Sequence, residues 1–146
     1  MEINTSRFGP VEIEPDDMLL FSNGLLAFEA HHHWVLLADP NNRAVAWLQS
    51  LSDPQVALPL VSPRRFVPGY QLRIGRGQLT PLELAALDRA FVLTILSRNQ
   101  GAVTVNLKAP IIINLDRRIG RQVVTSDEQP VQLPLPREAL PLRKSA

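Results

Sequence analysis

Short apolar runs recur along the chain at intervals of roughly ten residues, as in all-β domains. They are separated by turn-forming segments such as "EPDD", "DPNN" and "SDP". Several of the runs do not alternate cleanly, so we expect them to be covered on both faces. The pattern predicts strands over residues 11–14, 34–38, 44–50, 56–61, 70–74 and 90–96. It therefore favours a mainly β fold: a small, antiparallel, β-barrel-like single domain.

One segment carries the signals of a short helix. In "TPLELAALDRA", Thr80 stands at the N-cap position, Pro81 at the first helical position and Glu83 three residues after the cap. Such a capping box lets the threonine and the glutamate each accept a hydrogen bond from an amide of the first turn. The spacing predicts one short helix over residues 80–90 that covers the sheet.

The character of the chain changes at Pro130. Four prolines follow within a short distance, and proline interrupts both helices and strand ladders. We expect residues 1–129 to form the β-barrel-like domain and residues 130–146 to form a proline-rich tail that is extended or disordered. The prolines are Pro130, Pro134, Pro136 and Pro141.

The stretch "VTVNLKAPIIINLDRRIGRQVV", residues 103–124, predicts a bent strand followed by a hairpin. Its first half alternates between apolar and polar residues, which gives a strand with one buried face. Ala109-Pro110 then interrupts the ladder, because proline has no amide hydrogen. The isoleucines at 111–113 are expected to be covered on both faces. Asn106 and Lys108 would project beside the bend.

Composition and charge exclude some classes of protein. The chain has 146 residues, a net charge of +1 and no cysteine, so disulfides and thiolate chemistry are excluded. The N-terminal residues do not resemble a signal peptide, and no apolar run reaches the ~20 residues that span a bilayer. These features indicate a soluble, cytoplasmic protein with no membrane association.

Candidate catalytic and metal-binding patterns are weak. The three histidines at 31–33 could begin a zinc site, which leaves a metal-dependent enzyme as one hypothesis. However, no HExxH arrangement supplies further ligands, and no GxSxG or P-loop sequence is present. We therefore expect no catalytic residues, no metal and no cofactor.

A second hypothesis is a small β-barrel RNA-binding protein. Arg117, Arg118 and Arg121 lie in one turn, and Arg64-Arg65 form another basic site that could contact phosphates. The turn lacks the aromatic residues on which bases stack, and a dedicated nucleic-acid binder usually has a basic excess. No direct contact with nucleic acid is therefore expected, and a solvated hairpin loop is the alternative reading.

The order of several segments resembles a known family. "NLKAPIIIN" followed by "GRQVV" is similar to the signature of the flagellar assembly factor family FliW, and the segments before it agree in order and spacing. The resemblance extends from about Phe8 to Val124. The earlier segments are "FSNGLLAFE" (21–29), "WVLL" (34–37), "WLQSLSDP" (47–54), "SPRRFVPGY" (62–70) and "FVLTIL" (91–96).

The resemblance implies a barrel-like protein with no enzymatic activity and no cofactor. It implies binding to the carbon storage regulator CsrA, a translational repressor, and to flagellin, so that repression of flagellin translation is relieved. Three positions that are acidic in the family are neutral here: Ser52, Ser62 and Gly69. Loss of these charges would weaken attraction to a basic regulator. The polar residues that we expect to bind a partner are Glu29, Gln49, Asp53, Asn106 and Lys108.

Overall fold

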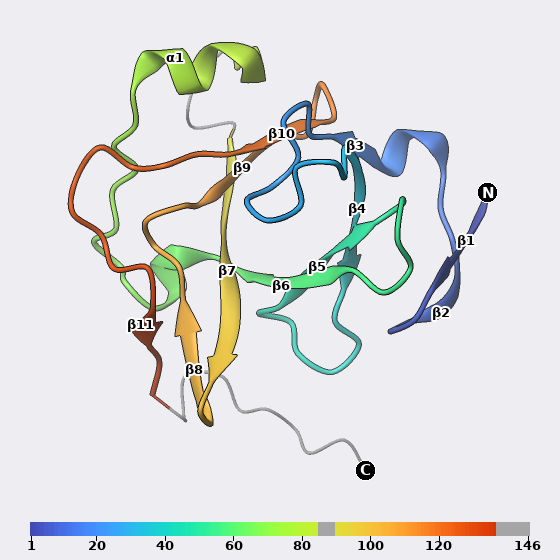
Figure 1. Ribbon diagram of the computed structural model, residues 1–146, viewed down its shortest axis with the longest axis horizontal. Helices are drawn as coiled ribbons and strands as arrows, with labels where there is room; N and C mark the ends of the chain where they lie inside the picture. The colour runs from blue at the N-terminus through green and yellow to red at the C-terminus, as the bar shows by residue number, and fades with distance from the viewer. Residues whose placement is uncertain (85–89, 137–146) are drawn as a thin grey trace.

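Strands form most of the secondary structure in the computed structural model, which describes residues 1–84 and 90–136. A short hairpin comes first, from β1 (Glu2–Thr5) and β2 (Gly9–Glu12). The remaining strands form one sheet (Figure 1), so the mainly β prediction is confirmed. They are β3 (Met18–Leu20), β4 (His33–Ala38), β5 (Ala46–Ser50), β6 (Ala57–Val61), β7 (Phe91–Asn99), β8 (Ala102–Val105), β9 (Ile111–Asn114), β10 (Ile119–Gln122) and β11 (Leu133–Pro134).

The sheet closes into a barrel because β7 pairs with β9 as well as with β6. The barrel contains seven strands, in the order β7, β6, β5, β4, β3, β10 and β9. All of these pairings are antiparallel except one, a short parallel pairing of β10 with β3 at Ile119 and Leu20. Closure leaves the seven strands without a free edge between them.

A bulge separates β8 from β9, at the bend predicted beside Pro110. Leu96 pairs with Val105 and Leu93 pairs with Ile111, so residues 106–110 lie opposite Thr94 and Ile95. The predicted bent strand is therefore one chain segment running along β7 with an insertion in its middle. Before the insertion it forms a hairpin with the far half of β7, outside the barrel (Figure 1). After the insertion it closes the barrel.

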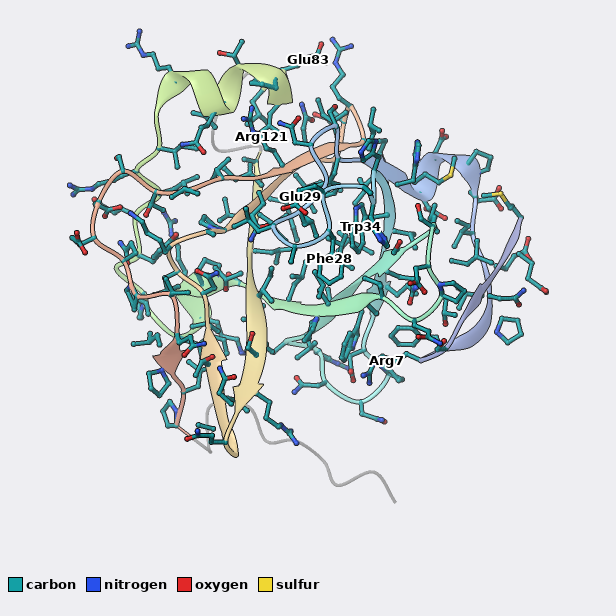
Figure 2. All side chains as sticks on the ribbon, viewed as in Figure 1. Arg7, Phe28, Glu29, Trp34, Glu83 and Arg121 are labelled. Carbon is teal, nitrogen blue, oxygen red and sulfur yellow. The ribbon has the colours of Figure 1, made fainter. Side chains whose placement is uncertain are left out.

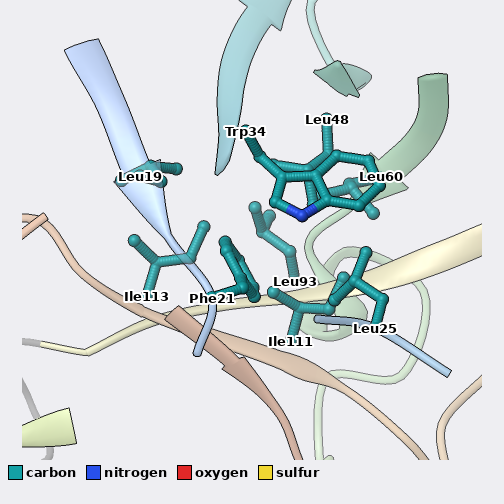
Figure 3. Close-up of a cluster of buried hydrophobic side chains, with 9 residues drawn as sticks. All are labelled: Leu19, Phe21, Leu25, Trp34, Leu48, Leu60, Leu93, Ile111 and Ile113. Atoms are coloured by element: carbon teal, nitrogen blue, oxygen red, sulfur yellow. The ribbon is translucent and has the colours of Figure 1, made fainter. Parts of the chain in front are cut away.

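The barrel interior is filled by large side chains that are almost fully removed from solvent (Figure 3). The rings of Phe21 and Trp34 meet edge to face with centroids 6.4 Å apart, a favoured geometry for aromatic pairs. Each such side chain stabilises the fold by about 1.5–3 kcal/mol relative to an exposed position. The cluster consists of Leu19, Phe21, Leu25, Trp34, Leu48, Leu60, Leu93, Ile111 and Ile113.

A second apolar layer covers β9 from outside. Ile112 points away from the interior and packs with Leu82 and Val123. All three isoleucines of β9 are 0% exposed, which confirms that this run is covered on both faces. The covering segment contains α1 (Arg76–Leu79) and a 3-10 turn, η3 (Thr80–Leu82).

Five of the six predicted strands overlap observed strands, although the N-terminal one is shifted to β2. The strand predicted over residues 70–74 is wrong. Tyr70, Leu72 and Ile74 alternate with exposed residues, but they pack onto the outside of the barrel rather than into a ladder. An alternating pattern in the sequence indicates that every second side chain is buried. Here an extended segment that pairs with no strand has the same alternation.

The predicted helix is also misplaced at its start. The α-helix begins at Arg76, so Thr80 lies at its C-terminal cap, and the hydroxyl of Thr80 donates to the Arg76 carbonyl at 3.0 Å. Glu83 has a left-handed φ of 52°, which ends the turn instead of completing a capping box. The side-chain amide of Asn114 donates to the Leu82 carbonyl at 2.9 Å, so a tertiary contact replaces the helical one. Residues 85–89 of the predicted helix lie outside the described residues.

The proline-rich segment contributes the last strand. Leu133 pairs with Val105 and Pro134 with Thr104, so β11 adds to the outer edge of β8. Its described part is extended and lies beside β8 (Figure 1). The division of the chain at residue 130 stays a prediction, and residues 137–146 lie outside the described part.

Gly120 provides a test of the barrel core. A Cβ atom added to Gly120 would lie 2.7 Å from two ring carbons of Phe21, which is fully buried and has no space to move. We expect Gly120→Ala to lower the free energy of unfolding by about 1–3 kcal/mol, as overpacking of a core does. Chemical denaturation monitored by tryptophan fluorescence measures this loss. Gly69→Ala is the control, because no atom lies within 4 Å of its added Cβ. Equal stability of both variants would contradict the packing.

Candidate protein-binding surface

The residues predicted to bind a partner lie in three segments outside the regular strands or at their ends. These segments are the β3–β4 loop (residues 21–32), the end of β5 with the β5–β6 loop (residues 49–56), and the bulge (residues 106–110). In chain order, the segments contain Glu29, then Gln49 and Asp53, then Asn106 and Lys108.

The β3–β4 loop folds back on itself in a tight turn. Leu25 and Phe28 exchange backbone hydrogen bonds of 3.2 and 2.8 Å, with Ala27 at a left-handed φ of 72°. Leu25 packs into the barrel core, while Leu26 at the tip is 57% exposed. Glu29 is exposed and accepts a 3.2 Å hydrogen bond from the Ala27 amide. Figure 2 shows Glu29 close to Phe28 and Trp34. The rings of Phe28 and Trp34 contact each other edge to face.

Gln49 has an internal role. Its side chain is 0% exposed, and its amide donates to the carbonyls of Ser50 and Val56 at 3.0 and 3.1 Å, with longer contacts to two further loop carbonyls. The expectation that its side chain reaches a partner is therefore not met in this conformation. The reason is local: the carbonyls of a tight loop need a donor, and Gln49 supplies it from β5.

A serine–histidine hydrogen bond joins the β5–β6 loop to the β3–β4 loop. The Ser50 hydroxyl accepts from the amides of Ser52 and Asp53 at 3.1 and 3.2 Å, and it lies 2.9 Å from Nδ1 of His31. A hydroxyl has two lone pairs and one proton. The Ser50 hydroxyl therefore joins the amides of its own loop to the ring of His31. Asp53 is half-buried, and its carboxylate accepts from the Gln55 amide at 2.9 Å.

Two of the three histidines, His31 and His32, bond to different partners. His31 bonds to Ser50, whereas Nε2 of His32 lies 3.0 Å from the Glu29 carbonyl. Among the residues that the structure describes, no group of three or more His, Cys, Asp or Glu side chains could hold a metal ion. The bonds of His31 and His32 stabilise the loops around them.

Asn106 and Lys108 organise the bulge. The side-chain oxygen of Asn106 accepts from the amides of Lys108 and Ala109 at 3.1 and 3.0 Å. The Lys108 ammonium donates to the carbonyls of Thr125 and Asp127 at 2.8 and 2.7 Å. Both side chains are half-buried, so their polar groups stabilise the chain's own turns at this surface.

Gln122, at the end of β10, links the bulge to the β3–β4 loop, and the sequence analysis did not select it. Its side-chain oxygen accepts from the Leu26 amide at 2.8 Å, and its side-chain nitrogen donates to the Ala109 carbonyl at 3.0 Å. The only signal in the sequence is a glutamine at the end of a short strand, next to the buried Val123. The bond pattern of Gln122 depends on two segments far away in the chain, which is why local reasoning missed it.

The basic turn is also partly engaged. Arg118 has a left-handed φ of 56° and donates to the Asp17 carbonyl at 3.0 Å, so it ties the β9–β10 hairpin to the segment before β3. Arg64 donates to the Tyr70 carbonyl at 3.1 Å. Arg117 is exposed and Arg121 is half-buried. This matches the reading of the segment as a hairpin loop more closely than the reading as a phosphate-binding site.

A charged and aromatic group lies at the other end of β5. Arg7 stacks 4.0 Å from the centroid of the Trp47 ring, and the Trp47 indole donates to the Asp39 carboxylate at 2.9 Å. Burial by itself would raise the pKa of Asp39. The hydrogen bonds from Trp47 and two loop amides, together with the charge of Arg7, outweigh it and lower this pKa below 3.8. Asp39 therefore stays ionised and holds the β4–β5 loop.

Tyr70 anchors the covering segment to the bulge. Its hydroxyl donates to the Leu107 carbonyl at 2.8 Å, and the residue is 4% exposed. Burial, followed by the negative charge of Asp127, raises the pKa of Tyr70 to about 12. The phenol is thus a neutral donor at any physiological pH.

Together these contacts make a pre-organised surface with an apolar tip and acidic neighbours. Leu26 and Glu29 are exposed on one loop, and the adjoining β5–β6 loop carries Asp53. Rigid loops lose little entropy when a protein partner binds. Within residues 1–84 and 90–136, no helix is long and apolar enough to cross a membrane.

Comparison with known proteins identifies one family. A family model described as "FliW protein" matches residues 2–135, which includes residues 130–135 of the proline-rich segment. The flagellar assembly factor FliW of Bdellovibrio bacteriovorus is 41% identical over 129 residues, covering 87% of this chain and 74% of that protein. The flagellar assembly factor FliW of Moorella thermoacetica is 38% identical over 127 residues, covering 85% of this chain and 80% of that protein.

The fold is similar to that of a solved member of the family. A crystal structure of the flagellar assembly factor FliW superposes with a TM-score of 0.85 and 26% sequence identity. The alignment covers 94% of this chain and 99% of that chain. The similarity therefore includes the barrel and the segments around it.

Removal of Gln122 should loosen the β3–β4 loop. We expect Gln122→Ala to increase hydrogen exchange at the Leu26 amide by roughly 2- to 10-fold, because one hydrogen bond contributes about 0.5–1.5 kcal/mol. Hydrogen exchange followed by NMR measures the rate. The control is Gln55→Ala, an exposed glutamine in the β5–β6 loop. An unchanged rate at Leu26 in the first variant would contradict the link.

The titration of Tyr70 tests its burial directly, because it is the single tyrosine of the chain. We expect phenolate absorbance to appear with a midpoint about 12 in the folded protein and near 10.0 in denaturant. The folded state binds this proton more tightly, so its contribution to stability is complete below pH 10.0 and is lost as the pH rises through about 12. A folded-state midpoint equal to that in denaturant would contradict the buried hydrogen bond.

Proposed function

This chain belongs to the FliW protein family, and we propose that it is a non-enzymatic flagellar assembly factor that binds the translational repressor CsrA and flagellin. Binding to CsrA would relieve repression of flagellin translation. Binding to flagellin would withdraw the factor from CsrA, so repression returns as unassembled flagellin accumulates. The protein would act in the cytoplasm, where flagellin is synthesised.

The observation that carries this proposal is the extent of the family match. It covers residues 2–135, so it includes all three segments of the candidate surface as well as the barrel. The relatives' shared name, flagellar assembly factor, describes a role in assembly. The mode of action by protein contact is what the family resemblance implies.

The structure of the candidate surface supports binding rather than catalysis. Ser50, Asn106 and Lys108 hold backbone groups of their own loops, and Ser50 also bonds to His31. Groups used in this way fix the shape of a surface. An exposed leucine with nearby carboxylates suits a protein partner, since an apolar anchor with a polar rim is the usual composition of an interface.

Electrostatic attraction should rest on the carboxylates that remain. Ser52, Ser62 and Gly69 are exposed in the structure, at positions where the family is acidic. Glu29 and Asp53 keep their charge on the β3–β4 and β5–β6 loops. Complementary charge mainly raises the association rate with a basic partner such as the regulator, and it does so less at high salt.

Charge-neutral variants that keep the local hydrogen bonds test this proposal. Glu29→Gln and Asp53→Asn preserve an acceptor for the Ala27 and Gln55 amides. We expect the double variant to bind purified CsrA roughly 3- to 10-fold more weakly at low salt, with a smaller dependence of affinity on salt. Calorimetric titration of CsrA, with and without purified flagellin, measures both effects.

The control variant is Glu2→Gln, which removes an exposed carboxylate from β1. It should bind as the unaltered chain does. A correctly folded, unaltered chain that binds neither CsrA nor flagellin at micromolar concentration would overturn the proposed function. If all variants bind CsrA equally well, the proposed function stands, but Glu29 and Asp53 do not belong to the binding surface.

A further inference from the structure

The outer edge of β8 is a strand edge that the barrel itself does not cover. β8 pairs with β7 on one side and with β11 on the other, and β11 is the last strand of the sheet. Without residues 130–136, the backbone groups along this side of β8 would face solvent. An uncovered strand edge is a template on which another extended segment can pair.

Residues 130–136 fit this edge with alternate side chains. The Leu135 amide donates to the Val103 carbonyl at 2.8 Å, and Leu133 pairs with Val105. Leu133 and Leu135 pack against an apolar cluster outside the barrel that includes Val105 and Leu107. The edge therefore accepts an extended segment through main-chain hydrogen bonds, with an aliphatic residue at every second position.

Prolines occupy the positions that face away from β8. Successive amides of a strand point to opposite sides, so residues 134 and 136 direct their nitrogen atoms outward. Both are proline and have no amide hydrogen to donate. The segment thus pairs inward through Leu133 and Leu135 and offers no donor at these two outer positions to a further strand.

Residues 131–136 make fewer stabilising contacts than the residues just before them. Leu133 and Leu135 are only half-buried, and Val131 is 56% exposed. By contrast, residues 125–127 are fixed by the Lys108 ammonium, and the Thr125 amide donates to the Lys108 carbonyl at 2.9 Å. The Pro130 carbonyl also accepts from the Leu107 amide at 3.0 Å. The chain is therefore anchored as far as Pro130, and residues 131–136 are held more weakly than this anchor.

We infer that the outer edge of β8 is a binding site for an extended segment of a protein partner, occupied in cis by residues 130–136. The partner segment carries aliphatic side chains at two alternate positions, which replace Leu133 and Leu135. The cis strand competes with it at the high effective concentration of a tethered segment, about millimolar. This inference goes beyond the proposed function and does not depend on which protein supplies the segment.

A disulfide lock and an open variant test the site. The chain has no cysteine, so Thr104→Cys with Pro134→Cys introduces a single pair. These two residues face each other across β8 and β11 as a non-hydrogen-bonded pair, whose short separation suits a disulfide. The open variant is the full chain with Leu133→Ser and Leu135→Ser. The probe is a fluorescently labelled peptide of residues 130–136, "PVQLPLP", and the control peptide has serine in place of both leucines.

We expect the peptide to bind the open variant at least roughly 10-fold more tightly than the unaltered chain, and to bind the reduced lock variant but not the oxidised one. Fluorescence anisotropy measures binding, and tryptophan fluorescence confirms that each variant is folded. If the open variant does not fold, peptide binding to the reduced and oxidised forms of the lock variant is a sufficient test of the inference. Equal binding to the oxidised and reduced forms, or equal binding of both peptides, would overturn the inference.

A second copy of the chain is the competing occupant. Sedimentation of the open variant over a range of concentrations distinguishes it. A monomer that binds the peptide supports a site for a partner segment. A dimer that the peptide dissociates would assign the edge to self-association and overturn the inference.

Discussion

The bulge at residues 106–110 is the constraint on which the rest of the structure depends. β7 has to close the barrel through β9 and also carry the hairpin with β8, and both use the same side of β7. The inserted residues let the chain leave the barrel and return to it. The insertion is possible because each amide that it frees has a partner: the Ile95 carbonyl, the Pro130 carbonyl, and the side chain of Asn106 for two amides. The fifth residue, Pro110, has no amide to satisfy.

The carbonyls of the bulge recruit the neighbouring segments in turn. Leu107 accepts from the Tyr70 hydroxyl, Ala109 from Gln122 and Pro110 from the Val123 amide. Unpaired buried backbone groups are costly, so these bonds are conditions of the fold. Through them, the covering segment, the end of β10 and the β3–β4 loop are all positioned relative to one irregularity. A change at the bulge would therefore also alter the β3–β4 loop, which Gln122 links to it.

As in the bulge, several polar side chains of the candidate surface form hydrogen bonds within their own chain. Gln49, Ser50 and Asn106 hold loops, and the surface also presents the exposed Leu26 and Glu29 and the half-buried Asp53. This division suits the proposed protein-binding role, because rigid loops bind with little loss of entropy. Lys108 has a further consequence, since its ammonium fixes the chain before β11 and thereby directs residues 130–136 to the edge of β8.

Much of the fold could be predicted from the sequence by itself. Apolar runs between turn residues determined the β class, the positions of β4, β5, β6 and β7, the bend beside Pro110 and the two-sided burial of β9, since burial of alternate or successive residues is a local property of a strand. The order of segments indicated the family. The tertiary structure decided the rest. Residues 70–74 have the pattern of a strand, yet they pack on the outside of the barrel without pairing. Thr80 has the pattern of an N-cap, yet the helix ends there, and the Leu82 carbonyl accepts a hydrogen bond from Asn114. Gln49 is polar but buried, and Gln122 joins segments far away in the chain, because a hydrogen bond depends on which atoms the closed barrel brings together.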